Sequence, residues 1–143
     1  MLIMHILRDK GEKVHTVSGD ATLEEAAREL NARKVGAVVV LDAEGALAGV
    51  LSERDIIREV ARNGARALSG PVCMAMTRAV FTATPDETVE EGLTRMTDRR
   101  VRHLPVVVKG RLVGIVSIGD LVKRKIEQAE AQAKALTDYI AAG

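Results

Sequence analysis

The feature that most constrains the fold is a seven-residue stretch that the chain contains twice. Gly49-Val-Leu-Ser52-Glu-Arg54-Asp55 returns as Gly114-Ile-Val-Ser117-Ile-Gly119-Asp120, 65 positions later. Each copy follows an apolar run typical of a strand and begins a stretch with helical periodicity. A chain that repeats a strand–helix junction in this way is predicted to fold as two similar units.

The repeat extends well beyond this motif. Asp20-Ala-Thr22-Leu-Glu-Glu25 returns as Asp86-Glu-Thr88-Val-Glu-Glu91, and in the first copy we expect Thr22 to cap a helix with Glu25 bonding back. The expected strands are residues 14–17, 35–41 and 47–51 in the first half and 80–83, 104–108 and 112–116 in the second. Each half is therefore predicted to be a β-α-β-β-α unit.

The predicted fold is α/β (α+β-like), with two units packed through their sheets in pseudo-twofold symmetry. Two short units sharing one core suit a chain of 143 residues. We expect a first domain over residues 1–70, which includes an N-terminal segment, and a second over 71–143. Residues 64–71, rich in Gly, Ala and Ser, are the candidate linker. In the helix 52–63, Ile56, Ile57 and Val60 are predicted to face the core.

The last helix, expected over residues 118–140, is too long for one small unit to cover. Apolar residues recur in it at alternating spacings of four and three, which is typical of a coiled-coil seam: Val122, Ile126, Ala129, Ala133, Leu136 and Ile140. The seam predicts packing on a second subunit. The alternative is a tail that folds back on its own domain.

Composition argues against several functions. Phe81 and Tyr139 are the only aromatic residues and the net charge is +1, so neither nucleic acid nor a membrane surface is an expected partner. A lone cysteine, Cys73, fits a reducing cytosol, and we expect a cytoplasmic protein. The three histidines have no metal-ligand spacing, and no nucleophile–base constellation is recognisable, so neither a metal site nor an enzyme is expected.

The repeated motif has two chemical interpretations. One carboxylate can accept from both hydroxyls of a ribose, and a helix N-terminus with a hydroxyl suits phosphate. Gly-x-x-Ser-x-x-Asp supplies these groups in order, with Arg54 as an added cation in the first copy only. Ser-x-x-Asp is equally a capping box that merely begins a helix. From the residues alone the two interpretations stay open.

The whole pattern resembles a tandem pair of CBS domains, the Bateman module. The phrases Gly49-Val-Leu-Ser-Glu-Arg-Asp55, Met76-Thr77, Arg102-His-Leu-Pro105 and Val116-Ser-Ile-Gly-Asp-Leu-Val122 are similar to those of stand-alone bacterial and organellar CBS-pair proteins. The resemblance implies a homodimer through CBS faces, here with the C-terminal helix. It also implies an adenine nucleotide (AMP, ATP or NAD(H)) in clefts between units, and no catalytic cofactor.

Site residues follow from the resemblance. It implies that Asp55 and Asp120 hold ribose, that Ser52 and Ser117 meet phosphate, and that main chain brackets the adenine. The bracketing positions are Thr16, Val17, Gly36 and Ala37 in the first half and Thr82, Ala83, His103, Leu104 and Pro105 in the second. Because Arg54 aligns with Gly119 and Gly36-Ala37 with Arg102-His103, the two clefts are expected to differ.

A cluster of basic residues precedes the last hairpin: Arg95, Arg99, Arg100, Arg102 and His103. Arg100, Arg102 and His103 are candidates for phosphate binding, whereas most of the cluster is expected to be a solvated face in which Glu91 pairs with Arg95. The resulting hypothesis is a non-catalytic nucleotide sensor that acts on an unidentified protein target. The alternative is a structural dimerisation module whose Ser-x-x-Asp motifs are caps only.

Overall fold

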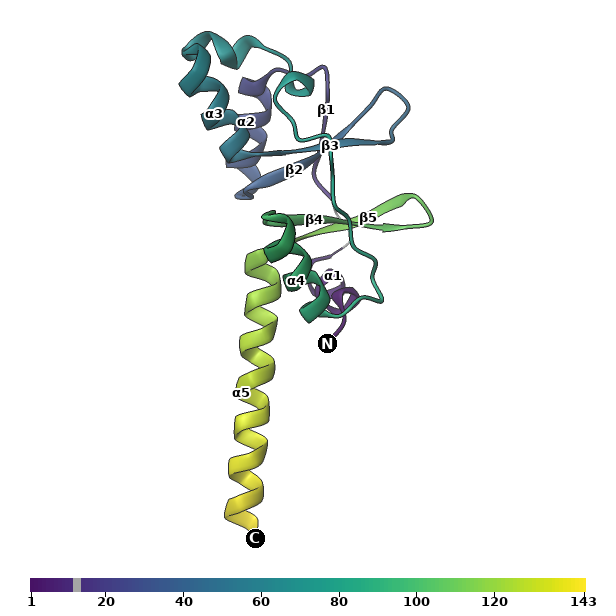
Figure 1. Ribbon diagram of the computed structural model, residues 1–143, viewed down its shortest axis with the longest axis vertical. Coiled ribbons are helices and arrows are strands. Elements are labelled where there is room, and N and C mark those ends of the chain that lie inside the picture. Colours follow the sequence, from purple (N-terminus) through teal and green to yellow (C-terminus); the bar gives the residue numbers. More distant parts are fainter. Residues whose placement is uncertain (12–13) are drawn as a thin grey trace. The chain divides into compact units, whose positions relative to one another are not determined.

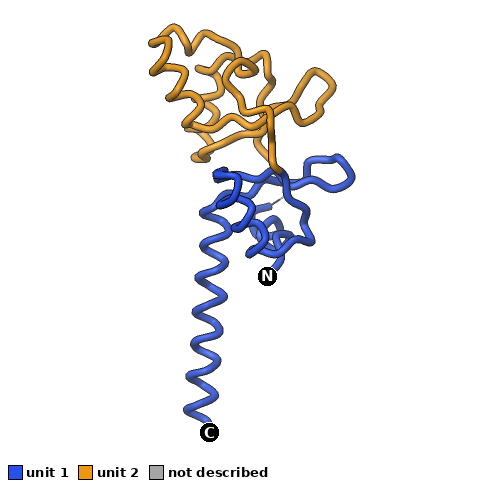
Figure 2. Tube along the Cα trace, in the orientation of Figure 1, with its two compact units in different colours: residues 1–12, 82–143 blue, residues 13–81 orange. Residues whose placement is uncertain are grey.

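The computed structural model describes residues 1–11 and 14–143. The chain forms two compact units, coloured separately in Figure 2. One comprises residues 13–81, and the other comprises residues 82–143 together with residues 1–12 from the start of the chain. The predicted boundary between residues 70 and 71 follows the sequence repeats, whereas packing groups the chain by these units.

The unit of residues 13–81 is built on a three-stranded sheet in the order β1 (Thr16–Ser18), β2 (Ala37–Leu41) and β3 (Leu47–Ser52). The first two strands are parallel and the last two antiparallel. Helices α2 (Leu23–Arg33) and α3 (Glu53–Asn63) follow β1 and β3 along the chain and lie beside each other in Figure 1. The elements match the predicted β-α-β-β-α order.

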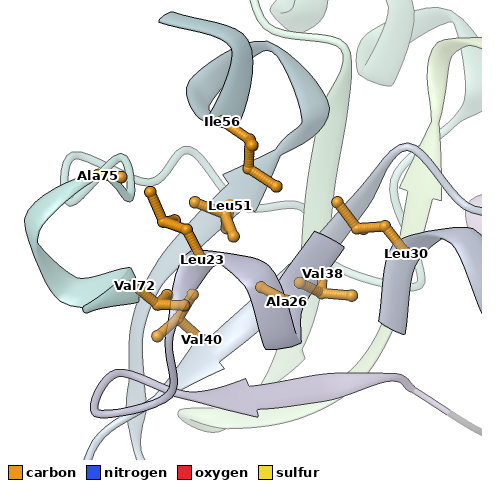
Figure 3. Packing of buried hydrophobic residues seen from close by; sticks show 9 residues of the cluster. All are labelled: Leu23, Ala26, Leu30, Val38, Val40, Leu51, Ile56, Val72 and Ala75. Atoms are coloured by element: carbon orange, nitrogen blue, oxygen red, sulfur yellow. The ribbon is translucent and has the colours of Figure 1, made fainter. Parts of the chain in front are cut away.

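The core of this unit is entirely aliphatic, as the near absence of aromatic residues requires. Figure 3 shows side chains of α2, α3 and the strands meeting between helices and sheet. The buried cluster consists of Leu23, Ala26, Leu30, Val38, Val40, Leu51, Ile56, Val72 and Ala75. The prediction for Ile57 was wrong: its side chain is 66% exposed, and Asp55 is buried with Ile56 on the inner face of α3.

Residues 64–71 are not a free linker, so that prediction was also wrong. Residues Ala65–Ser69 form a 3-10 helix, η1, and Val72–Met74 form a second, η2. The Gly70 carbonyl accepts from the Leu23 amide at 2.9 Å, and the Val72 amide donates to the Ala21 carbonyl at 2.8 Å. These bonds fix the segment against the start of α2, with Val72 fully buried.

The second unit contains helix α4 (Val89–Arg99), the hairpin β4 (His103–Val108) and β5 (Arg111–Ser117), and helix α5 (Ile118–Ala142). The predicted strand at residues 80–83 is reduced to one bridge, between Ala83 and Val106. In the first unit, the Val39 amide donates to the His15 carbonyl. The position equivalent to Val39 is Pro105, which has no amide proton, and this removes a ladder bond.

Helix α1 (Ile3–Lys10) completes the second unit although it begins the chain. Ile3 and Ile6 are buried, and the Ile3 amide donates to the Glu87 carbonyl at 2.9 Å. In the other unit, the Thr77 and Val50 main chains exchange hydrogen bonds of 2.9 and 3.0 Å. Each unit is therefore completed by the segment that precedes the other repeat.

Within the described residues, no helix is both long enough and apolar enough to span a membrane.

Candidate functional site

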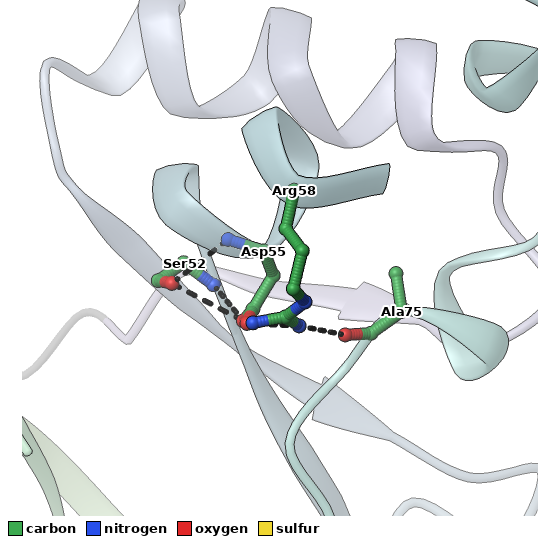
Figure 4. A network of polar contacts seen from close by, with 4 residues as sticks. All are labelled: Ser52, Asp55, Arg58 and Ala75. Carbon is green, nitrogen blue, oxygen red and sulfur yellow. Dashed lines mark hydrogen bonds and ion pairs between the residues drawn. The ribbon is translucent and has the colours of Figure 1, made fainter. Parts of the chain in front are cut away.

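The junction of β3 and α3 is a hydrogen-bonded capping box (Figure 4). The Ser52 hydroxyl accepts from the Asp55 amide at 3.3 Å, and Asp55 Oδ2 accepts from the Ser52 amide at 2.9 Å and from its hydroxyl at 3.1 Å. Asp55 Oδ1 accepts from Arg58 at 2.8 Å, and Arg58 also donates to the Ala75 carbonyl. Both carboxylate oxygens of Asp55 are thus engaged.

The junction of β5 and α5 repeats the capping box with a different cation. The Ser117 hydroxyl accepts from the Asp120 amide at 3.1 Å, and Asp120 Oδ2 accepts from the Ser117 amide at 2.8 Å. The Lys10 ammonium, on α1, donates to the same Oδ2 at 2.8 Å and to the Ile115 carbonyl at 3.1 Å. The cation here comes from outside the repeat.

The Asp120 carboxylate is held ionised by this arrangement. Burial raises the pKa of the carboxyl, but the hydrogen bond and the positive charge of Lys10, together with the hydrogen bonds from Ser117, lower it more, so the net pKa lies below the ordinary value. Asp120 is therefore an ionised acceptor at neutral pH.

The carboxylates of Asp55 and Asp120 differ in solvent exposure and in the number of oxygens that the described residues leave without a hydrogen bond. The Asp55 side chain is 7% exposed, whereas that of Asp120 is 24% exposed. Among residues 1–11 and 14–143, the hydrogen bonds to the Asp120 carboxylate end on Oδ2, which leaves Oδ1 as an open acceptor. Of the two junctions, as the described residues show them, the one between β5 and α5 therefore offers a carboxylate oxygen to a hydroxyl from outside.

A hollow of about 220 Å³ opens beside Asp120, between α1 and α5. Lys10, Lys123 and Arg124 line it together with Asp9 and Glu127, and Arg124 forms an ion pair with Asp9. Two ammonium groups and the Asp120 carboxylate thus line one space, together with the ion-paired Asp9 and Arg124 and with Glu127.

The glycine of each motif lies at a close contact, with main chain at Gly49 and with a side chain at Gly114. A Cβ on Gly49 would lie 2.6 Å from the Thr77 carbonyl oxygen and 2.8 Å from the Met76 sulfur. A Cβ on Gly114 would overlap the side chain of Leu7 on α1. The glycines admit the segment that completes each unit, so their position in the motif is explained without a ligand.

Of the other predicted site residues of the first unit, only some lie next to the Ser52–Asp55 motif. The Gly36 carbonyl accepts from the Glu53 amide at 3.0 Å, and Ala37 lies opposite Ser52 in the sheet. Thr16 and Val17 lie opposite Val39 and Val40, farther along the ladder. Arg54 is exposed on α3.

In the second unit, the Arg102 carbonyl accepts from the Ile118 amide at 2.8 Å, and His103 lies opposite Ser117. Leu104 and Pro105 follow in β4, both buried. These positions border the β5–α5 junction through their main chain.

The Thr82 carbonyl accepts from Arg95 at 2.9 Å, which places Thr82 beside α4. The predicted Glu91–Arg95 pair was wrong, because Arg95 pairs with Glu87 at 2.5 Å. Glu87 lies in the loop before α4. The Arg95 guanidinium, which was expected on a solvated face, contacts both Glu87 and the Thr82 carbonyl.

Sequence reasoning missed both cations that contact the motif carboxylates. Arg58 lies three residues after Asp55, so helical spacing alone could have indicated it. Lys10 is 110 positions from Asp120, and no local pattern connects them. The described residues contain no group of three or more His, Cys, Asp or Glu side chains that could hold a metal ion.

The chain is similar in sequence and in structure to proteins that contain CBS domains. The family model for the CBS domain matches residues 7–62 and 72–127. A mitochondrial CBS domain-containing protein of Arabidopsis thaliana, CBSX3, is 32% identical over 149 residues, covering 99% of this chain and 72% of that protein. A CBS-domain-containing protein of Agrobacterium tumefaciens has a crystal structure with 44% identity and a TM-score of 0.84, covering 87% of this chain and 92% of its own.

Two further similar structures contain ligands. A CBS domain protein of Pyrobaculum aerophilum, solved with AMP, is 30% identical with a TM-score of 0.75 and covers 84% of this chain and 89% of its own. The CBS domain pair of protein MJ0100, solved with 5′-methylthioadenosine and S-adenosyl-L-methionine, is 27% identical with a TM-score of 0.80 and covers 90% and 98%. An adenosine group is common to all three ligands.

Proposed function

Since the chain belongs to the CBS-domain family as a tandem pair, we propose that it is a non-catalytic sensor that binds an adenosine-bearing ligand at the β5–α5 junction. The observation that carries this proposal is the open Oδ1 of an ionised Asp120 beside a hollow lined by Lys10 and Lys123. AMP is the first candidate, and ATP and NAD(H) share its adenosine and phosphate.

The chemistry of the junction matches the parts of a nucleotide. Asp120 Oδ1 accepts from ribose hydroxyls while Oδ2 keeps its bonds to the Ser117 amide and Lys10. The ammonium groups of Lys10 and Lys123 are cations for phosphate. The positions that the family resemblance implies for the base are Arg102 and His103, next to Ser117, with Thr82 and Pro105; the carbonyls of Arg102, Thr82 and Pro105 already accept hydrogen bonds within the protein.

A second function is favoured in the other unit. Asp55 has both oxygens bonded and is nearly inaccessible, so the Ser52–Asp55 box acts there as a structural helix cap. The role of Arg54, Gly36 and Ala37 as ligand contacts is correspondingly weaker. The two motifs are thus proposed to differ, with ligand binding at Asp120. The sequence had suggested the opposite, because Arg54 adds a cation to the motif of Asp55.

The test is the ligand-induced rise in melting temperature for AMP, ATP, NAD, NADH, adenosine and 5′-methylthioadenosine. We expect stabilisation of the wild type by at least one phosphate-bearing ligand, since binding to the folded state alone raises apparent stability. The rise should vanish in Asp120→Asn and persist in Asp55→Asn. If no ligand stabilises the wild type, both motifs are caps and the structural alternative holds.

A further inference from the structure

The second half of α5 carries an apolar stripe that is exposed to solvent. The first half is fixed to its unit by the buried Leu121 and by Lys125, whose ammonium lies 2.8 Å from Glu90 on α4. Every residue from 129 onward is exposed, and Leu136 and Ile140 are 61% and 69% exposed. Figure 1 shows α5 continuing past α4 and α1.

An uncovered helix of this length is physically unfavourable. The stretch after Gln128 is no longer than the roughly 12–15 residues at which isolated helices are marginal in water, even when rich in alanine. Burying the stripe against another helix would supply the missing stabilisation. The sequence and charges of α5 indicate what that other helix is.

The stripe has the residue types of a parallel two-stranded coiled coil. In heptad terms, Ile126, Ala133 and Ile140 occupy position a. Val122, Ala129 and Leu136 occupy position d. Isoleucine at two of the three a positions and leucine at one of the three d positions are the residue types that favour parallel dimers, and the central alanines permit close approach.

The charges that flank the stripe are complementary in the parallel arrangement. Lys125 is at position g and Glu130 at the following e, which are the positions that meet between parallel helices. Symmetry makes this contact twice. In an antiparallel pair centred on the same stripe, Glu130 would instead face Glu130 of the second copy, and like charges oppose pairing.

We infer that α5 is an interaction surface for a second copy of this chain, paired parallel and in register through Ile126, Ala129, Ala133, Leu136 and Ile140. Lys125 retains donors for Glu130 of the second copy, because an ammonium has three and only one is used on Glu90. The inference does not depend on nucleotide binding, since the stripe lies beyond the β5–α5 junction.

Cysteine cross-linking tests the orientation directly. In a Cys73→Ala background, Leu136→Cys places two thiols side by side in the parallel pair. In an antiparallel pair Leu136 would meet Ile126, which separates the two thiols by about 15 Å along the axis. The matched control is Asp138→Cys at the outward position f. We expect an oxidised dimer for Leu136→Cys and little for the control; equal cross-linking of both, or none, overturns the inference.

Charge exchange provides a second measurement that leaves the stripe intact. By sedimentation equilibrium, Lys125→Glu and Glu130→Lys should each weaken the dimer about tenfold, the change expected when two weak attractions become repulsions. The double exchange should restore it, and Lys134→Glu at the outward position b should have no effect. A wild-type monomer, or a dimer insensitive to both exchanges, contradicts the proposed pairing.

Discussion

Lys10 and Asp120 are joined by a 2.8 Å ion pair between residues 110 positions apart. The contact ties the end of α1 to the first turn of α5, and the same ammonium bonds to the Ile115 carbonyl. The repeated motif alone therefore does not define the second site: its cation comes from a helix that precedes the first repeat.

Lys10→Met should raise the pKa of the Asp120 carboxyl toward its ordinary value, because the hydrogen bond from Lys10 helps to lower it. NMR titration of the side-chain carbonyl carbon measures this pKa. Lys123→Met removes an equal charge from the same hollow and is the control. An equal rise in both variants would show that the field of the hollow, rather than the ion pair, sets the pKa. The loss of stability should stay within about 1 kcal/mol, as for exposed pairs.

Acid should weaken the fold partly through Asp120. A carboxyl whose pKa is lower in the folded state than in the unfolded state stabilises the fold when it is ionised. This contribution begins to be lost when the pH falls below the unfolded-state pKa of about 4, and it is gone once the pH has fallen through the lowered folded-state pKa. Between about pH 6 and about pH 3, an interval that spans the ordinary pKa of aspartate, the urea midpoint of the wild type should therefore drop more than that of Asp120→Asn. Equal drops would contradict the assignment. The wild type must be compared with Asp120→Asn because other carboxyls also contribute to acid sensitivity: hydrogen bonds from Thr84 and Lys125 lower the pKa values of Asp86 and Glu90.

Asp55→Asn should destabilise the protein more than Asp120→Asn does. The carboxylate of Asp55 is nearly buried and bonds to Ser52 and Arg58, and hydrogen bonds to charged groups contribute about 1.5–3 kcal/mol each. Urea unfolding at neutral pH gives both free energies of unfolding. Ser52→Ala and Ser117→Ala, which remove equivalent caps, should cost a similar amount of about 1 kcal/mol and serve as the reference. A larger loss for Asp120→Asn would reverse the structural and binding roles assigned to the two motifs.

Gly49→Ala should destabilise the fold by about 1–3 kcal/mol, the usual cost of overpacking. Its new methyl group would meet the Thr77 main chain, which cannot move without breaking the bonds to Val50. Gly114→Ala meets only the flexible side chain of Leu7. Its cost should be smaller, as measured by urea unfolding.

Leu7→Ala provides the matched rescue for this pair. It should suppress the cost of Gly114→Ala in a double-mutant cycle, and it should leave the cost of Gly49→Ala unchanged. Independence of Leu7 and Gly114 in the cycle would contradict the close packing of α1 on β5.

Local rules predicted the elements of the fold. Thr22 and Thr88 cap α2 and α4 through the Glu25 and Glu91 amides, at 3.1 and 3.0 Å, as the threonines of the repeated Thr-x-x-Glu indicate. The return bond expected from the Glu25 side chain is not found among the described residues. The hairpins follow from turn residues next to β-branched runs. The capping boxes at Ser52 and Ser117 correspond to one of the two interpretations that the sequence left open, because each needs only residues three apart.

Nonlocal packing explains what sequence reasoning missed. Ile57 satisfies the helical pattern, but Asp55 takes the inner face because Ser52 and Arg58 satisfy its carboxylate there. The lost strand at residues 80–83 depends on Pro105, in a different element. The position of α1 beside β5, and with it the contact of Lys10 with Asp120, depends on packing between distant parts of the chain.

Isothermal titration of AMP into the wild type, Asp120→Asn and Asp55→Asn measures whether Asp120 holds the nucleotide. We expect one ligand per chain for the wild type and for Asp55→Asn, and no measurable binding for Asp120→Asn. Both variants should remain folded by circular dichroism at the titration temperature. Binding that survives in Asp120→Asn and disappears in Asp55→Asn would place the ligand at the other motif and contradict the role proposed for Asp120.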